Sequence, residues 1–188
     1  MFRRWTLVLL VHLTIWPTLS AFIRPPMTAP EKQPKPLHLK EDPEEELQTA
    51  DMIRFWGYPA EVYNATTDDG YILEMQRIPY GIRGPSNCGN RPVILMVHGL
   101  ESSSADWVMN LPNESPGFLY ADAGFDVFLG NVRGNTYGKN HRTLTTNDEK
   151  FWEFSWDEIA LQDLPALINK ALEISGQPTL YYMGHSQG

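Results

Sequence analysis

Cysteine is almost absent from this chain of 188 residues, because Cys88 is the only one, and an internal disulfide framework is therefore excluded. Cys88 lies in a loop rich in Gly, Pro and Asn, and we interpret it as a free thiol or as the partner of a cysteine beyond residue 188. Positive charge is also scarce: 15 Lys and Arg stand against 23 Asp and Glu, which gives a net charge of -8. No basic stripe is available to neutralise phosphates, so we expect no nucleic-acid partner.

Metal-binding motifs are lacking as well. The sequence has no HExxH or CxxC motif. The acidic groups at residues 44–46 and 148–158 are interpreted as helix starts and solvated faces. We therefore expect neither a metal nor a cofactor.

No apolar run is long enough to cross a membrane. The mostly apolar segment from Trp5 to Trp16 follows Arg3 and Arg4 and has about a dozen residues, against the roughly 20 of a spanning helix. Pro17 ends the run, and small residues near positions 20 and 21 suit a cleavage site. Residues 1–21 therefore predict a cleaved signal peptide rather than a transmembrane anchor.

The next segment, residues 22–43, is rich in proline and predicts a linker or pro-segment. Residues 44–188 remain for a folded domain. Entry into the secretory pathway would make Asn64 and Asn113 candidate glycosylation sites, because each begins an Asn-x-Ser/Thr triplet. The alternative for both is an ordinary polar turn, and Pro116 should lower the use of Asn113.

The first part of the domain predicts a helix and a hairpin. Asp42-Pro43 with the following glutamates predicts a helix start, and the helix should run to about Trp56 and end at Gly57. Its expected buried side consists of Leu47, Met52, Ile53 and Trp56. Two strand-like runs at 61–66 and 71–78 are joined through Asp68-Asp69-Gly70, which is a strong hairpin signal.

The rest of the domain alternates strand and helix. The continuous apolar run 93–97 predicts a strand of a parallel sheet covered on both faces. A helix at 116–123, a strand at 126–129, a helix at 155–174 and a strand at 179–183 should follow. The long helix has an apolar stripe at helical spacing: Trp156, Ile159, Ala160, Leu164, Leu167, Ile168, Ala171 and Leu172. This layout predicts an α/β fold with its site at the carboxyl ends of the strands.

The last five residues, Gly184-His185-Ser186-Gln187-Gly188, form a G-x-S-x-G motif. Directly after an apolar strand, this motif indicates the nucleophile elbow of an α/β-hydrolase, where a sharp turn exposes the serine. Gly184 and Gly188 allow strand and helix to approach closely. Ser186 is therefore the expected nucleophile, and it needs a base to take its proton.

The negative charge formed during acyl transfer needs hydrogen-bond donors. In this fold they are the N–H after the nucleophile, here Gln187, and one from the loop after an earlier strand. We expect the second to be the N–H of Leu100, in His98-Gly99-Leu100. His98, His141 and His185 are not expected to act as the base, because none should come within hydrogen-bond reach of Ser186.

A series of blocks across Met52 to Gly188 resembles the acid lipase family, which includes gastric and lysosomal acid lipases. The blocks are Trp56-Gly57-Tyr58-Pro59, Asp69-Gly70-Tyr71-Ile72-Leu73, Arg77-Ile78-Pro79, His98-Gly99-Leu100, Asn110-Leu111-Pro112, Leu119-Tyr120-Ala121-Asp122-Ala123-Gly124, Leu129-Gly130-Asn131, Arg133-Gly134-Asn135, Phe151-Trp152-Glu153-Phe154-Ser155, Asp163-Leu164-Pro165-Ala166 and Tyr181-Tyr182-Met183. The resemblance implies a secreted or lysosomal serine hydrolase of lipid esters, acting at a lipid–water interface without a metal. Gly138 departs from the family, whose members often carry Ser there.

The triad order of this fold is Ser, then Asp or Glu, then His. Both partners of Ser186 should therefore follow it in the sequence. We expect the chain to be the N-terminal part of such a lipase, a partial α/β-hydrolase without full activity. The two alternatives are a short secreted protein that binds lipid or a partner without catalysis, and a carboxylesterase for small soluble esters.

Overall fold

The computed structural model describes residues 46–85 and 91–188. The predicted signal peptide, the proline-rich segment, the helix start at Asp42-Pro43 and Cys88 lie outside these residues. Within them, a hairpin of β1 (Glu61–Thr66) and β2 (Tyr71–Ile78) is the first part of the sheet. Gly70 in its turn has a φ of 107°, which an L side chain rarely adopts. The predicted hairpin and its strand bounds are confirmed.

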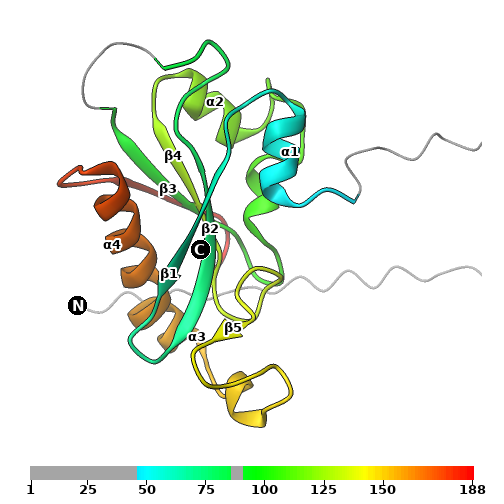
Figure 1. The fold of residues 1–188 in the computed structure, drawn as a ribbon, viewed down its shortest axis with the longest axis vertical. Helices are drawn as coiled ribbons and strands as arrows, with labels where there is room; N and C mark the ends of the chain where they lie inside the picture. Colours follow the sequence, from blue (N-terminus) through cyan, green and yellow to red (C-terminus); the bar gives the residue numbers. More distant parts are fainter. Residues whose placement is uncertain (1–45, 86–90) are drawn as a thin grey trace, which may run out of the picture. The chain divides into compact units, whose positions relative to one another are not determined.

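Three parallel strands continue the sheet. They are β3 (Val93–Val97), β4 (Asp126–Gly130) and β6 (Tyr181–Gly184). The order is β1-β2-β4-β3-β6, with β2 antiparallel to β4 (Figure 1). A short strand that the sequence did not predict, β5 (Asn140–His141), pairs with β2. The antiparallel hairpin followed by parallel strands is the predicted α/β layout.

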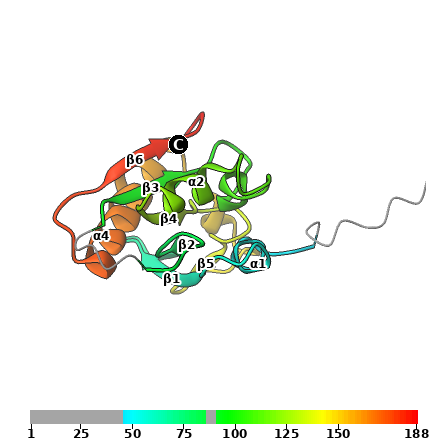
Figure 2. The same cartoon turned by 90° about the horizontal axis from the view of Figure 1, so that it is seen from above.

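Helices cover both faces of this sheet (Figure 2). On one face, α1 (Thr49–Phe55) and α2 (Pro116–Asp122) contribute Ile53 and Phe118 to a core cluster with Ile94 and Met96 of β3. On the other face, α4 (Leu164–Ser175) packs against alternate residues of the same strand, including Leu95. All five residues of β3 are buried, as its unbroken apolar run predicted.

The first helix is shorter than predicted. It begins at Thr49 with Gln48 as N-cap, and Glu46 to Gln48 are not helical. Its buried residues are Thr49, Ala50 and Ile53, whereas Met52 and Trp56 are only partly buried against the core. The predicted helix is therefore not continuous through Glu46 to Gln48, and contact with the sheet outweighs local helix preference at these residues. The predicted end at Gly57 is confirmed, with a φ of 81°.

The long helix is interrupted. Its parts are α3 (Trp156–Glu158), a π-helical segment η3 (Ile159–Asp163) and α4. Ser155 and Glu158 form a capping box at its start, and Gly176 ends it in the left-handed region. The residues of the predicted apolar stripe are therefore not buried alike: Leu167 and Ala171 are buried, but Trp156 is 69% exposed. The π segment turns the first part of the helix away from the core.

Two short 3-10 helices, η1 (Ser104–Trp107) and η2 (Glu149–Trp152), lie in the connections. β6 is the last strand in the sheet order, and its Tyr181 and Tyr182 are exposed. No helix in the described part of the chain is long and apolar enough to cross a membrane.

An ionic cluster around the buried Arg133 joins the hairpin turn, the loop after β4 and the long helix. The guanidinium of Arg133 donates to Asp69 at 2.6 Å through Nη1 and to Asp163 at 2.8 Å through Nε. The Arg133 backbone N–H also donates to Asp163, and the ring of Tyr71 lies 3.9 Å from the guanidinium carbon. Burial opposes the charge, but the hydrogen bonds to both carboxylates raise the pKa of Arg133. The cluster therefore holds a buried charge with its partners in place.

Replacing Asp163 should destabilise the protein strongly. Asp163→Asn removes one charge and leaves Arg133 buried with an unmatched partner, which should lower the free energy of unfolding by about 3–5 kcal/mol. Glu173→Gln, in the exposed pair of Glu173 with Lys170, is the matched control and should change it by less than about 0.5 kcal/mol. Urea unfolding measures both, and equal losses would contradict a structural role for the buried cluster.

Candidate active site

Ser186 lies at a strained turn directly after β6. Its φ is 56°, and the only other non-glycine residue with positive φ in the described part of the chain is Glu101. Such a conformation persists only where the surroundings enforce it. Here His185 N–H donates to the Val97 carbonyl at 3.0 Å and Gly188 N–H donates to the His185 carbonyl at 2.9 Å. These bonds hold the turn against the end of β3.

The two glycines of the motif are required by space. A Cβ on Gly184 would overlap with the carbonyl oxygen of Gly188, and a Cβ on Gly188 would overlap with that of Val97. Both contacts are with backbone, which cannot rotate aside. The glycines therefore allow the tight turn that the motif predicted.

The loop after β3 lies against the serine. A Cβ on Gly99 would come within 3.2 Å of both the Cβ of Ser186 and Nδ1 of His185. The N–H groups of Leu100 and Gln187 have no acceptor among the described residues. The structure thus brings together a serine and two residues with free backbone donors, which are the nucleophile and the oxyanion donors that acyl transfer needs besides a base.

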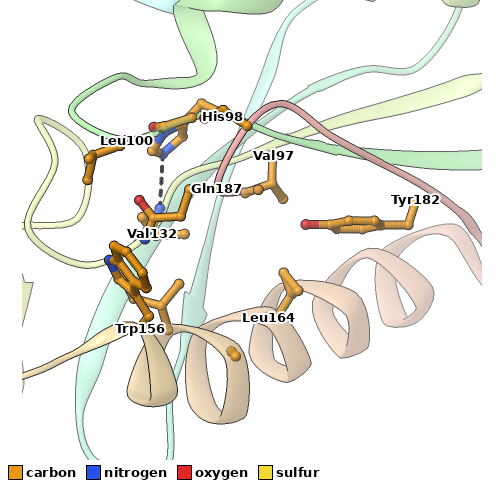
Figure 3. Close-up of a pocket in the computed structure, with 13 residues that line it drawn as sticks. Val97, His98, Leu100, Val132, Trp156, Leu164, Tyr182 and Gln187 are labelled. Atoms are coloured by element: carbon orange, nitrogen blue, oxygen red, sulfur yellow. Dashed lines mark hydrogen bonds between the residues drawn. The ribbon is translucent and has the colours of Figure 1, made fainter. Parts of the chain in front are cut away.

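Beside them is an apolar cavity of about 470 Å³ (Figure 3). Trp156, Ile159, Ala160 and Leu164 reach it from the long helix, and Tyr182 reaches it from β6. Trp156, Ile159 and Ala160, which do not pack in the core, therefore line this cavity, whereas Leu164 contacts both the cavity and the core. The exposed side chain of Leu100 lies at its rim, next to Gln187. The arrangement can hold an apolar chain beside Ser186.

None of the three described histidines donates to or accepts from Ser186. The exposed His185 points toward Asp106, with 4.0 Å between Nδ1 and the nearer carboxylate oxygen. His141 is tied to the hairpin turn, because its Nε2 lies 2.9 Å from the Asp69 carbonyl. His98 is 3% exposed and hydrogen-bonded to the loop around it. That none of these residues is the base stays a prediction.

His98 has an environment that favours its uncharged form. Burial lowers its pKa, against smaller opposing effects of the Gly99 carbonyl and Asp106. It contacts Asn135, which in turn contacts Asn131. We assigned no role to these asparagines from the sequence. Their position directly after the buried strand β4 is the signal that could have identified them, since site residues gather at the carboxyl ends of parallel strands.

The remaining expected sites are on the surface. Asn64, in β1, and Asn113, before α2, are both exposed. Among the described residues, no three His, Cys, Asp or Glu side chains form a group that could hold a metal ion.

Comparison with known proteins gives two family models that together cover the described domain. Residues 49–111 match the family model for a partial alpha/beta-hydrolase lipase region, and residues 92–188 match that for the alpha/beta hydrolase fold. Lipase lipl-3 of Caenorhabditis elegans is 56% identical over 155 residues, which are 81% of this chain and 38% of that protein. Human lysosomal acid lipase/cholesteryl ester hydrolase is 50% identical, over 78% of this chain and 37% of that protein. Human gastric triacylglycerol lipase is 49% identical with the same two shares, 78% and 37%. The chain thus spans less than two fifths of each relative.

The low pKa of His98 predicts a pH-dependent part of the stability. Unfolded His98 binds a proton near its ordinary pKa of 6.5, whereas the folded residue does so only at lower pH. Its contribution is therefore complete above pH 6.5 and is lost as pH falls from there through the folded pKa.

His98→Asn removes this titration. The drop in free energy of unfolding from about pH 8 to about pH 5.5 should be smaller in the variant than in the unmodified chain. Urea unfolding at the two pH values measures it, and an unchanged drop would contradict the low pKa.

Proposed function

This chain belongs to the α/β-hydrolase fold family, and we propose that it carries the nucleophile and oxyanion site of a hydrolase acting on lipid esters. The observation that supports this most directly is Ser186 at its strained turn against Gly99, beside an apolar cavity that is also lined by Leu100 and Gln187, whose N–H groups have no acceptor among the described residues. The lipase names of the relatives support the same substrate class.

In the proposed reaction, Oγ of Ser186 attacks the ester carbonyl carbon while its proton passes to a base. The carbonyl oxygen becomes negatively charged and accepts hydrogen bonds from the N–H groups of Leu100 and Gln187. Collapse of this intermediate breaks the ester bond, and the alcohol leaves with the proton from the base. Water then attacks the acyl-Ser186 ester, which releases the fatty acid and restores the serine.

The reaction also needs a general base that takes the proton of Ser186. The triad order of the fold places the acid and the histidine after the nucleophile, and no described histidine is bonded to Ser186. We propose that both groups lie outside the described residues. The described residues alone should then hydrolyse esters only slowly, through oxyanion stabilisation and binding without proton transfer.

The lining of the cavity favours a substrate with a long apolar acyl group rather than a small soluble ester. Its lining is dominated by the aliphatic and aromatic side chains of α3, η3, α4 and β6. Burial of each acyl CH₂ in such a surface contributes about 0.8 kcal/mol. We propose a triacylglycerol or a sterol ester at a lipid–water interface as the substrate, with a carboxylesterase for small esters as the competing function.

The same proposal places the protein in the secretory pathway, either secreted or lysosomal. The names of the lysosomal and gastric relatives support this, together with the apolar segment after Arg3 and Arg4. The exposed Asn64 and Asn113 are then the proposed glycosylation sites. Mass spectrometry of the glycosidase-treated secreted protein tests both.

Ser186→Ala should abolish hydrolysis. The rate of hydrolysis of a p-nitrophenyl ester is measured for two forms of the protein. One is the chain of 188 residues, and the other is the product of the full open reading frame of the gene. We expect the reading-frame product to lose about 10⁶-fold in kcat with the substitution. Binding of an apolar fluorescent ester by the Ser186→Ala variant controls for folding. Hydrolysis that persists in the variant would favour a non-catalytic lipid-binding role for this site.

Trp156→Ala should separate a lipase from an esterase. Trp156 lines the cavity beside Ser186, so its loss should reduce kcat/KM for a long-chain ester by about 10-fold and leave a short soluble ester nearly unchanged. Leu161→Ala is the control, because Leu161 is equally exposed, on the next turn, but lines a different hollow. Equal losses on long and short esters would favour the carboxylesterase.

A further inference from the structure

The protonation state of His98 follows from a chain of backbone-anchored contacts. Tyr137 N–H donates to Oδ1 of Asn135 at 2.9 Å, so the Nδ2 group of that amide faces the opposite side. There Nδ2 of Asn135 lies 2.9 Å from Nε2 of His98 and 2.9 Å from Oδ1 of Asn131. Ser104 N–H donates to the same Asn131 oxygen, at 2.9 Å, which identifies it as an acceptor. Nε2 of His98 therefore faces a donor and must accept.

The other nitrogen of the ring must then carry the proton. Nδ1 of His98 lies 2.8 Å from the carbonyl oxygen of Gly99, which can only accept. The backbone N–H of Val132 also points at Nε2, at 3.4 Å (Figure 3). Two donors on one side and one acceptor on the other admit a single neutral tautomer, with the proton on Nδ1.

This proton fixes the orientation of one peptide unit. The Gly99 carbonyl and the Leu100 N–H belong to the same planar trans peptide, so they point in opposite directions. Ser102 N–H also donates to the Gly99 oxygen, at 3.3 Å, across a turn in which Glu101 has a φ of 56°. With its carbonyl held by two donors, the peptide directs the Leu100 N–H to the side away from the imidazole.

We propose that His98 is a positioning residue for the oxyanion site: the Asn135 amide selects its Nδ1–H tautomer, and that proton holds the Gly99 carbonyl so that the Leu100 N–H meets the developing negative charge. This inference rests on the proposed function. It adds a residue that touches neither substrate nor Ser186 but determines the direction of one donor. Asn135 is the second part of the same device.

Burial supports the role, because it lowers the pKa of His98 and favours the uncharged ring. Protonation of Nε2 would direct a third N–H at the donors of Asn135 and Val132. Asp106 acts in the opposite direction, and its carboxylate also lies 4.0 Å from His185. The neutral tautomer should therefore persist at mildly acidic pH.

A matched pair of variants separates the two nitrogens of the ring. By side-chain length, the amide of His98→Asn replaces Nδ1 and can still donate to the Gly99 carbonyl. The amide of His98→Gln replaces Nε2, so it can accept from Asn135 but leaves the carbonyl without its side-chain donor. We expect His98→Gln to lower kcat by about 100-fold with KM little changed, and His98→Asn to lower it by less than about 10-fold.

The kcat and KM of both variants are measured in the form of the protein whose ester hydrolysis is lost in Ser186→Ala. The melting temperature of each variant is the folding control. If Ser186→Ala leaves hydrolysis intact, the proposed function fails before the pair is interpreted. If Ser186 is essential but both variants lose kcat equally, or the loss appears in KM, the positioning role is overturned.

The tautomer itself is testable without catalysis. In the printed chain, ¹⁵N NMR of His98 should show a protonated Nδ1 and an unprotonated Nε2. Asn135→Asp replaces the donor facing Nε2 with an acceptor, which should move the proton of the neutral ring to Nε2. Asn135→Ser removes the donor without adding a charge, so the preference for the proton on Nδ1 should weaken but not reverse, because the Val132 N–H and the Gly99 carbonyl remain. A proton on Nε2 in the unmodified chain would overturn the inference.

Discussion

The buried charge of Arg133 is the constraint on which the rest of the site depends. A guanidinium in the interior is tolerated only when its donors are satisfied, and here Asp69 and Asp163 satisfy them. Asp69 belongs to the hairpin turn and Asp163 to the end of the π segment. Since both must reach one side chain, the hairpin, the loop after β4 and the long helix are held in one arrangement.

The contact between Asp163 and Arg133 explains the role of the π segment. Asp163 turns inward to Arg133, while Trp156, Ile159 and Ala160 on the preceding turns face the cavity beside Ser186. A regular helix would place the apolar stripe on one face along its whole length. The extra residue in the turn lets the same helix contribute to the core at one end and to the site at the other.

A second polar set continues from the sheet to the serine. Asn131 donates to the Glu74 carbonyl of β2 and accepts from Asn135, which contacts His98 beside Gly99. Each of these groups is buried or partly buried, so each must find a partner. Because every partner is fixed by backbone or by the next side chain, the loop that carries Leu100 is held without any contact to a ligand.

Local patterns were sufficient for much of the fold. The hairpin at Gly70 and the apolar run of β3 follow from turn chemistry and burial, which are readable in a few neighbouring residues, and both were correct. The family resemblance is confirmed by the matches to lipases. The predicted continuous helix was wrong at Glu46 to Gln48, which are not helical, because α1 begins at Thr49, where the helix starts to pack Ile53 against the sheet.

The sequence by itself determined the fold class, the position of the G-x-S-x-G turn after its strand and the loop that faces it. These depend on the spacing of residues along the chain, which the amino-acid sequence gives directly. Only the tertiary structure decided the break in the long helix, the partners of Arg133 and the tautomer of His98. Those depend on contacts between residues 30 to 64 positions apart. A buried polar group must form a hydrogen bond, and the fold decides which partner lies within reach.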